Sequence, residues 1–381
     1  MPQRVVILLD DLLGGGAARV AAHLSAAWAE RGRAVTLLTT DDGREGSFFE
    51  LHPAVRHRPL GLRSVSRHPL QALTSNFRRL GILRRAFQVE HPDFIISFLD
   101  SNNVMCLLAT RGLPRVPTVI SERTDPSARS IGFAWEFLRR WTYPWADCLV
   151  TQSAHALGYF SPEVQARGRV IPNPVLPLAR MEGRSPGTRG PRRLVTTLGR
   201  LNRVKGHDLL VEAFASLAPE FPDWDLAIHG EGSERPALEA RIRALGLTSR
   251  IQLPGATTQV AARLQEADLF VLPSRTEGFP NALAEAMACG LPVVSFDCRS
   301  GPSELIRPGV DGVLVPPEDV PGLARAMAGL MGDPAERARL SVQAPEVLNR
   351  FSLNRVLELW ESALQFASQP HRERTIPCSQ D

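Results

Sequence analysis

Residues 194–217 read LVTTLGRLNRVKGHDLLVEAFASL, and this stretch decides the fold. The apolar run at 194–198 predicts a strand, and the apolar positions of 206–217 recur with the period of a helix. The same unit of strand, turn and helix is repeated along the chain. Strands that alternate with helices indicate parallel sheets covered by helices. The expected fold class is therefore α/β.

The alternation continues on both sides of this stretch. After it, strands are expected at 226–229, 251–253, 269–272 and 292–295, with helices at 236–245, 260–266 and 281–289. Before it, strands are expected at 4–10, 34–40, 94–98, 118–121 and 148–151, with a helix at 17–30. A chain of 381 residues is also too long for one ordinary core. Two successive α/β domains are therefore expected.

The domain boundaries follow from composition. Residues 176–193 are rich in Pro, Gly and Arg without periodicity, which is typical of an exposed connector. We expect one domain at 1–175, a linker at 176–193 and a second domain at 194–352. A helix at 353–368 is expected to pack back towards the N-terminal domain, and 369–381 to form a disordered tail. Ligands of such sheets bind at the carboxyl ends of the strands, so two facing domains would share a central cleft.

The overall composition favours a soluble globular protein, with 44% hydrophobic and 22% charged residues. No apolar run approaches the ~20 residues that span a bilayer. The apolar start at 5–9 ends at Asp10 and Asp11, which favours a buried strand over a secretory signal. The five cysteines are scattered and form no CxxC pair, so neither a zinc site nor a disulfide framework is expected. A cytoplasmic location follows.

The basic residues are unusual in kind, because the chain has 43 Arg and a single Lys, Lys205. The one retained Lys marks a place where a compact ammonium on a flexible stem is required. Arg200 and Lys205 both lie in the turn after a predicted strand and before a predicted helix. A diphosphate would find there a planar guanidinium, a point charge and helix N–H groups. The alternative is a pair of solvated loop cations.

A family resemblance becomes specific at residues 277–294, EGFPNALAEAMACGLPVV. This run resembles the signature of the retaining glycosyltransferases of family 4, whose GT-B fold implies two Rossmann-like, doubly wound domains. Gly199-Arg200, followed by Lys205-Gly206 and a helix, resembles the second hallmark of that family. Gly14–Gly16 and Pro172-Asn173 extend the resemblance over nearly the whole chain. The match is strongest from 194 to 316.

The resemblance implies roles for single residues. Arg200, Lys205 and Glu277 are the expected catalytic residues, with Glu277 holding the donor sugar and Glu285 the ribose. For Glu285, the alternative is that its charge only complements the helix dipole. For the turn at 278–281, the alternative is an ordinary helix entry with Asn281 as the N-cap. The expected donor-binding residues are Gly15, Gly16, Gly199, Arg200, Lys205, Glu277, Gly278, Phe279, Pro280, Asn281, Ala282, Leu283 and Glu285.

The N-terminal half is expected to bind the acceptor. Relatives often carry Glu-Arg after the first glycines, whereas this chain has Ala18-Arg19. Any role of that glutamate in acceptor binding is therefore absent here. Glu122 and Arg123 follow a predicted strand and are candidate contacts to the acceptor or the donor sugar. A structural ion pair is the alternative for these two residues.

The implied reaction is transfer of a sugar from a nucleoside-diphosphate donor to an acceptor hydroxyl, with retention. No cofactor and no metal are expected, and Asp223-Trp224-Asp225 is interpreted as a polar lead-in to a strand. Ser300-Gly301-Pro302-Ser303-Glu304 resembles a subgroup that extends lipid-linked or surface oligosaccharides, often from UDP-sugars. A GDP-mannose-type mannosyltransferase, a GT-B epimerase and an inactive sugar-nucleotide-binding protein are the alternatives. No nucleic-acid partner is expected.

The segment 51–90 carries eight Arg and one acid, Glu90. Its apolar residues are compatible with an amphipathic helix over 76–89. We therefore expect peripheral docking on an anionic membrane at the inner face, where a lipid-linked acceptor would lie. The alternative is that the apolar side chains pack on the sheet. The residues concerned are Phe77, Leu80, Ile82, Leu83 and Phe87, with Arg78, Arg79, Arg84 and Arg85.

Overall fold

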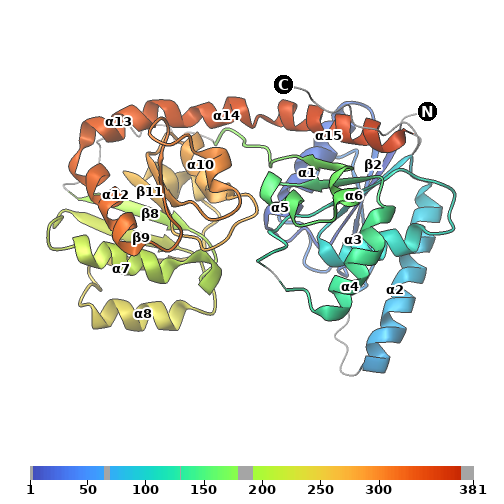
Figure 1. Ribbon diagram of the computed structural model, residues 1–381, viewed down its shortest axis with the longest axis horizontal. Coiled ribbons are helices and arrows are strands. Elements are labelled where there is room, and N and C mark those ends of the chain that lie inside the picture. Colours follow the sequence, from blue (N-terminus) through green and yellow to red (C-terminus); the bar gives the residue numbers. More distant parts are fainter. Residues whose placement is uncertain (1–2, 64–68, 129, 179–191, 370–381) are drawn as a thin grey trace. The chain divides into compact units, whose positions relative to one another are not determined.

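The computed structural model describes residues 3–63, 69–128, 130–178 and 192–369. The chain divides into two compact units: an N-terminal unit, which is 1–173 with 353–381, and a C-terminal unit, which is 174–352 (Figure 1). Most of the predicted linker (179–191) and of the predicted tail (370–381) lies outside the described residues. In the described part no helix is long and apolar enough to cross a membrane.

The N-terminal unit contains a seven-stranded sheet in the order β3-β2-β1-β4-β5-β6-β7. All of its neighbouring strands pair in parallel. The two edge strands, β3 and β7, were not expected, because RHRP and GRV are short and lack an apolar run. The strands are β1 (Arg4–Leu9), β2 (Ala34–Thr39), β3 (Arg56–Pro59), β4 (Phe94–Phe98), β5 (Thr118–Ser121), β6 (Cys148–Thr151) and β7 (Gly168–Val170).

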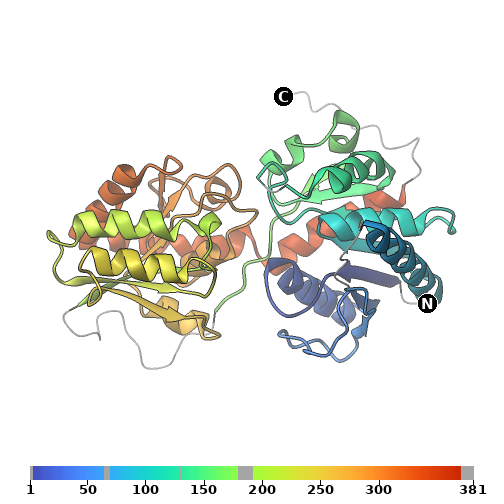
Figure 2. The ribbon, with the colours of Figure 1, turned by 90° about the horizontal axis from the view of Figure 1, so that it is seen from below.

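Helices cover both faces of this sheet, because successive side chains of each strand point to opposite faces. Ile7 and Leu9 pack with α1 (Gly16–Glu30) and α15 (Leu353–Ser368), whereas Val6 and Leu8 pack with α2 (Pro69–Glu90) and α3 (Asp100–Thr110). Beside α3, α4 (Phe133–Thr142) covers the β5–β6 side of the second face. Figures 1 and 2 show these helices on the two sides of the sheet. The shorter elements are η1 (Tyr143–Trp145), α5 (Ala154–Gly158) and α6 (Pro162–Gln165).

The C-terminal unit repeats this plan with six parallel strands in the order β10-β9-β8-β11-β12-β13. Its helices again lie on both faces: α7, α8 and α12 pack on one side, and α9, α10 and α14 on the other. The strands are β8 (Arg193–Leu198), β9 (Trp224–His229), β10 (Ile251–Gly255), β11 (Leu269–Leu272), β12 (Val293–Phe296) and β13 (Val313–Val315). The helices are η2 (Arg203–Lys205), α7 (His207–Leu217), α8 (Arg235–Ala244), α9 (Val260–Gln265), α10 (Asn281–Ala288), α11 (Pro302–Leu305), α12 (Val320–Gly332), α13 (Pro334–Gln343), η3 (Ala344–Glu346) and α14 (Val347–Arg350).

Each sheet reverses its direction of growth once. The reversal falls between β1 and β4 in the N-terminal unit and between β8 and β11 in the C-terminal unit. Loops on the two sides of such a switch point lead away from each other and leave room for a ligand at the carboxyl ends of the strands. The predicted fold of two doubly wound α/β sheets is confirmed. The predicted site residues of the C-terminal unit lie at the switch point between β8 and β11.

Candidate functional site

The turn after β8 is held in place by its own backbone and by the end of β11. The Asn202 side chain accepts a hydrogen bond from the Lys205 N–H at 3.2 Å. Gly206 then adopts a left-handed conformation with φ 63° and opens α7. A Cβ atom on Gly206 would lie 1.9 Å from the carbonyl oxygen of Pro273, so only glycine fits this close approach. Lys205 is therefore positioned directly beside the chain that follows β11.

Lys205 and Glu277, which are 72 residues apart in the sequence, form an ion pair across the switch point. The Lys205 Nζ atom donates to Glu277 Oε1 at 2.6 Å, and Ser274 Oγ donates to the same oxygen at 2.7 Å. The Glu277 side chain is only 7% exposed, whereas that of Lys205 is 24% exposed. Glu277 Oε2 accepts no hydrogen bond from the described residues, so it remains available to a ligand.

Arg200 is exposed in the same turn, and its side chain forms no hydrogen bond or ion pair with the described residues. Gly199, just before it, packs against the stem of Lys205, because a Cβ there would lie 3.4 Å from Lys205 Cγ. The turn thus combines an unengaged guanidinium, a lysine held by one carboxylate and the start of α7. Such a set of donors and positive charges suits a phosphate-containing ligand.

His207, the first residue of α7, was not singled out in the sequence. His207 is 2% exposed, and its ring lies beside the backbone of Gly199 and Arg200 without forming a hydrogen bond of ordinary geometry with the described residues. Burial, followed by the charge of Lys205, lowers the pKa of His207 to about 4. The imidazole is therefore neutral at physiological pH. A single histidine in a helical pattern gives no sequence signal for such a position.

The segment Gly230-Glu231-Gly232 supports the turn from the neighbouring strand. A Cβ on Gly230 would lie 1.9 Å from the Gly199 carbonyl oxygen, and one on Gly232 would lie 2.3 Å from that of Leu201. The Leu201 N–H donates to the Glu231 carbonyl oxygen at 2.9 Å. These glycines permit close packing of two backbones behind the turn.

The segment after Glu277 enters α10 through a compact turn. Phe279 is buried against Phe351, with ring centroids 5.9 Å apart, and Ser300 Oγ donates to the Gly278 carbonyl oxygen at 3.3 Å. The loop after β12 therefore joins the same carboxyl edge of the sheet. Pro280, rather than Asn281, is the N-cap of α10, because Asn281 already has helical geometry.

The remaining predicted residues of α10 differ in exposure. Leu283 is fully buried in the core, whereas Asn281 and Ala282 are half-buried. Glu285 is also half-buried and lies in the second turn of the helix, where the field of the helix terminus is weaker. The alternative of a dipole role for Glu285 therefore applies less well than the sequence suggested.

In the N-terminal unit, the predicted glycines follow β1 at the other switch point. Gly15 has φ 88° and is the N-cap of α1, and Gly16 is the first residue of that helix. No side chain blocks the turn, since a Cβ on Gly15 would have no neighbour within 4 Å. The turn therefore leaves open space beside the backbone.

Glu122 and Arg123 are both buried in the N-terminal unit. Glu122 accepts a hydrogen bond from the Tyr143 hydroxyl and lies 3.8 Å from the buried Arg139 guanidinium. The Arg123 guanidinium donates to Asn173 and to Ser121 Oγ, and burial lowers its pKa to about 9. Both side chains are therefore enclosed by partners inside the N-terminal unit. This burial favours the structural alternative over a role in ligand binding.

The stretch 51–90 forms β3 and α2, but most of its apolar side chains face the core. Leu83 and Phe87 are buried, and Leu80 and Ile82 pack against the same cluster. Arg58 binds Glu90 at 3.0 Å. The predicted amphipathic helix therefore exists, yet its apolar face covers the sheet. Residues 64–68 lie outside the described part. The members of the stretch that remain exposed include Phe77, Arg78 and Arg85.

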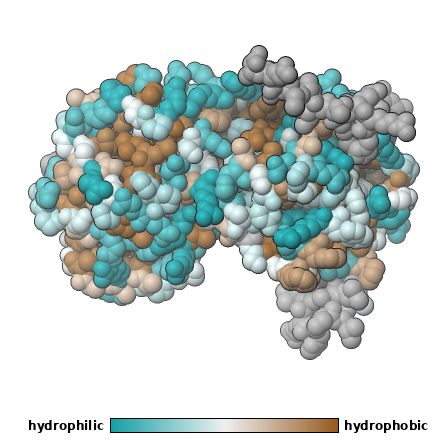
Figure 3. Space-filling view, in the orientation of Figure 1, coloured by the Kyte–Doolittle hydropathy of each residue, from teal (hydrophilic) through white to brown (hydrophobic). Residues whose placement is uncertain are grey.

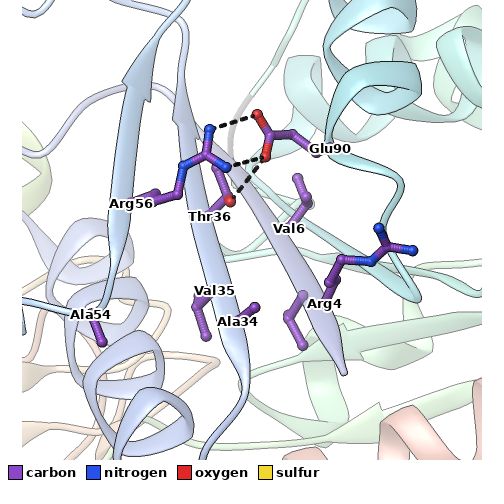
Figure 4. A pocket seen from close by; sticks show the side chains of 9 residues that line it. Arg4, Val6, Ala34, Val35, Thr36, Ala54, Arg56 and Glu90 are labelled. Carbon is purple, nitrogen blue, oxygen red and sulfur yellow. Dashed lines mark hydrogen bonds and ion pairs between the residues drawn. The ribbon is translucent and has the colours of Figure 1, made fainter. Parts of the chain in front are cut away.

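A small cavity in the N-terminal unit lies away from the switch point of that unit. Figure 4 shows it at the amino ends of β1, β2 and β3, where Arg4, Thr36 and Arg56 line it. Glu90 closes one side and accepts hydrogen bonds from Thr36 Oγ1 at 3.2 Å and from Arg56. The lining groups satisfy one another, so we interpret this cavity as structural.

The two doubly wound sheets, each with a glycine turn beside its switch point, have the architecture of the GT-B fold. Sucrose-phosphate synthase from Thermosynechococcus elongatus has this fold, with a TM-score of 0.79 over 96% of this chain and 100% of that one, at 21% identity. Residues 15–174 match the model described as "Glycosyl transferase 4-like domain", and residues 182–347 match "Glycosyl transferases group 1". The chain therefore belongs to glycosyltransferase family 4.

Two relatives differ in how much of their length this chain covers. An exopolysaccharide phosphotransferase of Streptomyces coelicolor is 33% identical over 73% of this chain, but the match spans 29% of that protein. A Campylobacter jejuni protein is 26% identical over 94% of this chain and 97% of its own length. Its name is GalNAc-alpha-(1->4)-GalNAc-alpha-(1->3)-diNAcBac-PP-undecaprenol alpha-1,4-N-acetyl-D-galactosaminyltransferase.

Proposed function

We propose that this protein transfers a sugar from a nucleoside-diphosphate donor, with a UDP-sugar as the first choice, to an acceptor hydroxyl with retention. The observation that carries the proposal is the Lys205–Glu277 ion pair at the β8/β11 switch point, in a segment that matches the group 1 model. Arg200, exposed in the same turn, supplies a second cation. These groups suit a donor that carries both phosphates and sugar hydroxyls.

The chemistry assigned to these groups is electrostatic. The bond between the anomeric carbon and the diphosphate breaks, and negative charge develops on the leaving diphosphate. Arg200, Lys205 and the N-terminus of α7 stabilise that charge. The acceptor oxygen bonds to the same face of the anomeric carbon, and its proton passes to a diphosphate oxygen. Glu277 holds the donor sugar through Oε2, while Lys205 and Ser274 fix Oε1. The mechanism uses no cofactor or metal.

The acceptor that we propose is a lipid-linked or surface oligosaccharide. The support is the name of the Campylobacter relative, which covers almost the whole chain and is named for an undecaprenol-linked substrate. A protein acting on such a lipid would work in the cytoplasm at the inner face of the membrane. Contact through residues 51–90 stays part of this proposal, but it would depend on the exposed Arg78 and Arg85.

The test is a thermal-shift screen of UDP, GDP and ADP and their sugars, followed by a transfer assay with a polyprenyl-diphosphate-linked oligosaccharide. A ligand that binds only the folded state raises the melting temperature, so the preferred nucleotide should stand out. NMR of the new linkage should show the anomeric configuration of the donor. A GDP-mannose response in place of a UDP response would select the mannosyltransferase alternative. If no nucleotide shifts the melting temperature, the donor site is wrongly assigned.

A further inference from the structure

An exposed aromatic stripe on α4 has no part in the donor site. Phe133, Phe137 and Trp141 follow one another at intervals of four residues, so they lie on one face of the helix. Their exposed fractions are 89%, 60% and 54%. Single exposed apolar residues are common, but an ordered row of large ones marks an interaction surface. Figure 3 shows apolar side chains at the lower edge of the N-terminal unit, in the region where Figure 1 places α4.

The opposite face of α4 packs against the core, so the aromatic stripe is held facing solvent. Trp135 and Leu138 pack against the core between the helix and the sheet. The buried Arg139 guanidinium donates to Glu136 and, at 2.9 Å, to the Tyr159 hydroxyl. These contacts leave the helix no freedom to rotate its aromatic face inward. The three exposed rings are therefore a fixed feature of the surface.

The aromatic stripe continues into η1 and ends beside the guanidinium of Arg111. Trp141 packs edge-to-face on Trp145, with ring centroids 4.6 Å apart. The exposed Arg111 stacks over the Trp145 ring at 4.5 Å. Aromatic rings next to arginines suit the headgroup region of a bilayer, where one side of the contact is apolar and the other is wet and anionic.

The charge around the stripe is positive. On α4 the Arg140 side chain is 77% exposed, and its neighbour Glu136 is already paired with Arg139 and Arg140. Arg78 and Arg85 are exposed on α2, together with Phe77 at 67%. Both α2 and α4 pack against α3, so the two helices belong to one side of the sheet. Arg78 and Arg85, which form no ion pair with the described residues, attract an anionic surface.

We propose that this surface, defined as Phe133, Phe137 and Trp141 with Arg78, Arg85, Arg111 and Arg140, docks on an anionic lipid bilayer. The rings enter the headgroup region and the arginines bind lipid phosphates. The excess of positive charge favours this occupant over a second copy of the chain, which would bring the same charges together. The use of such docking rests on the proposed lipid-linked acceptor, but the binding itself does not.

The test is co-sedimentation of the full chain with vesicles of phosphatidylcholine alone or with phosphatidylglycerol. We expect binding to the anionic vesicles at low salt. The triple variant Phe133→Ser, Phe137→Ser, Trp141→Ser should lose at least about tenfold in partitioning. Arg78→Gln with Arg85→Gln should weaken binding and reduce its salt dependence. The matched control, Phe48→Ser with Val342→Ser, removes side chains that are 58% and 74% exposed elsewhere and should bind as the wild type does.

A second measurement follows insertion directly. All six tryptophans are described, and Trp141 is the one that is exposed, so brominated lipids should quench its fluorescence. Trp141→Phe should remove most of that quenching while vesicle binding is retained. Absence of binding by the wild type, or unchanged binding by the triple variant, overturns the proposal. So does a dimer in solution that the triple variant dissolves.

The donor site gives an independent readout for the same variants. Nucleoside-diphosphate affinity, measured by calorimetry, should be unchanged in the triple variant. If vesicle binding fails while nucleotide binding and sugar transfer succeed, only the docking inference falls. If vesicle binding succeeds without any nucleotide binding, only the proposed function falls.

Discussion

At the scale of single residues, the charges of the candidate donor site centre on the buried Glu277. It holds the single lysine of the chain at 2.6 Å and keeps a second oxygen available to a ligand. A nearly buried carboxylate is stable only with a partner, so Lys205 has a structural role beside the functional role that we propose for it. Substitutions of Lys205, Glu277 and Glu285 separate these roles.

Replacing Lys205 tests the assignment of the diphosphate site. Lys205→Ala removes a charged hydrogen bond, so affinity for nucleoside diphosphate should fall by about 1.5–3 kcal/mol. Lys205→Arg should also be impaired, because the stem packs on Gly199 and the ammonium meets Glu277 in a geometry that a planar guanidinium does not reproduce. Calorimetric titration gives the affinity. Arg203→Lys, at an exposed neighbour, is the control and should bind normally. Wild-type affinity in both Lys205→Ala and Arg200→Ala would reject the site.

The two glutamates are expected to act on different parts of the donor. Glu285→Gln should weaken binding of free nucleoside diphosphate, because its proposed partner is the ribose. Glu277→Gln keeps an acceptor for Lys205 and Ser274, so it should bind free nucleotide almost normally but transfer sugar slowly. Calorimetry and initial rates measure the two effects. Equal losses of free-nucleotide affinity would contradict this division.

His207 predicts a pH dependence of stability. Burial, and next the charge of Lys205, lowers its folded pKa to about 4, whereas the unfolded chain titrates near 6.5. The stability contributed by the neutral ring is fully present above pH ~6.5 and is lost as the pH falls towards 4. In urea unfolding, the stability difference between wild type and His207→Phe should change by about 2 kcal/mol between pH 7.5 and 5. His91→Asn, at an exposed histidine, is the control. Parallel pH profiles for wild type and His207→Phe would contradict this role.

At the scale of elements, the junction of η2 and α7 sets the position of Lys205. Gly206 has φ 63° and faces the Pro273 carbonyl oxygen, whereas Gly246 has φ 69° with no neighbour within 4 Å. The two glycines therefore share a backbone conformation and differ in available space. Substitutions at the two positions therefore separate the free-energy cost of a left-handed backbone from the cost of a steric clash.

Alanine substitutions make that comparison. Gly246→Ala should lower the free energy of unfolding by about 1–2 kcal/mol, the usual cost of a left-handed alanine. Gly206→Ala adds the clash with Pro273, so it should cost more and should also weaken nucleotide binding. Urea unfolding and calorimetry measure the two effects. Equal destabilisation by both substitutions, with normal nucleotide binding, would show that the junction relaxes freely.

At the scale of the whole molecule, the last helix of the sequence completes the core of the N-terminal unit. Trp360 is fully buried there with Trp28 and Phe98, and Glu361 accepts a hydrogen bond from Trp28 Nε1 at 2.7 Å. The N-terminal unit therefore requires residues synthesised after the C-terminal unit. We therefore expect that its stability and nucleotide binding can be changed separately.

Trp360→Ala is the test of that separation. A large cavity should lower the stability of the N-terminal unit by about 3–5 kcal/mol. Affinity for free nucleoside diphosphate should be retained, because its proposed partners Arg200, Lys205 and Glu285 lie in the C-terminal unit. Leu359→Ala, one position away and 38% exposed, is the control and should cost far less. Unfolding monitored with and without nucleotide distinguishes the two units. Loss of nucleotide binding in Trp360→Ala would mean that the units are not independent.

Much of the fold could be predicted from the sequence, because periodicity and turn residues are local properties. The strand–turn–helix unit at 194–217 and the run at 277–294 indicated the α/β class and the family, and both predictions are confirmed. The edge strands β3, β7 and β13 were missed, since RHRP and GRV carry no apolar period and VLV is only three residues long. Their pairing depends on a neighbouring strand that is already in place.

The sequence by itself determined most of the elements, the family and the residue types available for a donor. Only the tertiary structure decided which of them meet: Lys205 binds Glu277, and Glu122 is enclosed by Tyr143 and Arg139. It also decided that the apolar face of α2 covers the sheet while the aromatic face of α4 meets solvent. The physical reason is that an amphipathic period specifies an apolar face but not what covers it. Strand order sets those contacts, and strand order depends on pairings between segments far apart in the chain.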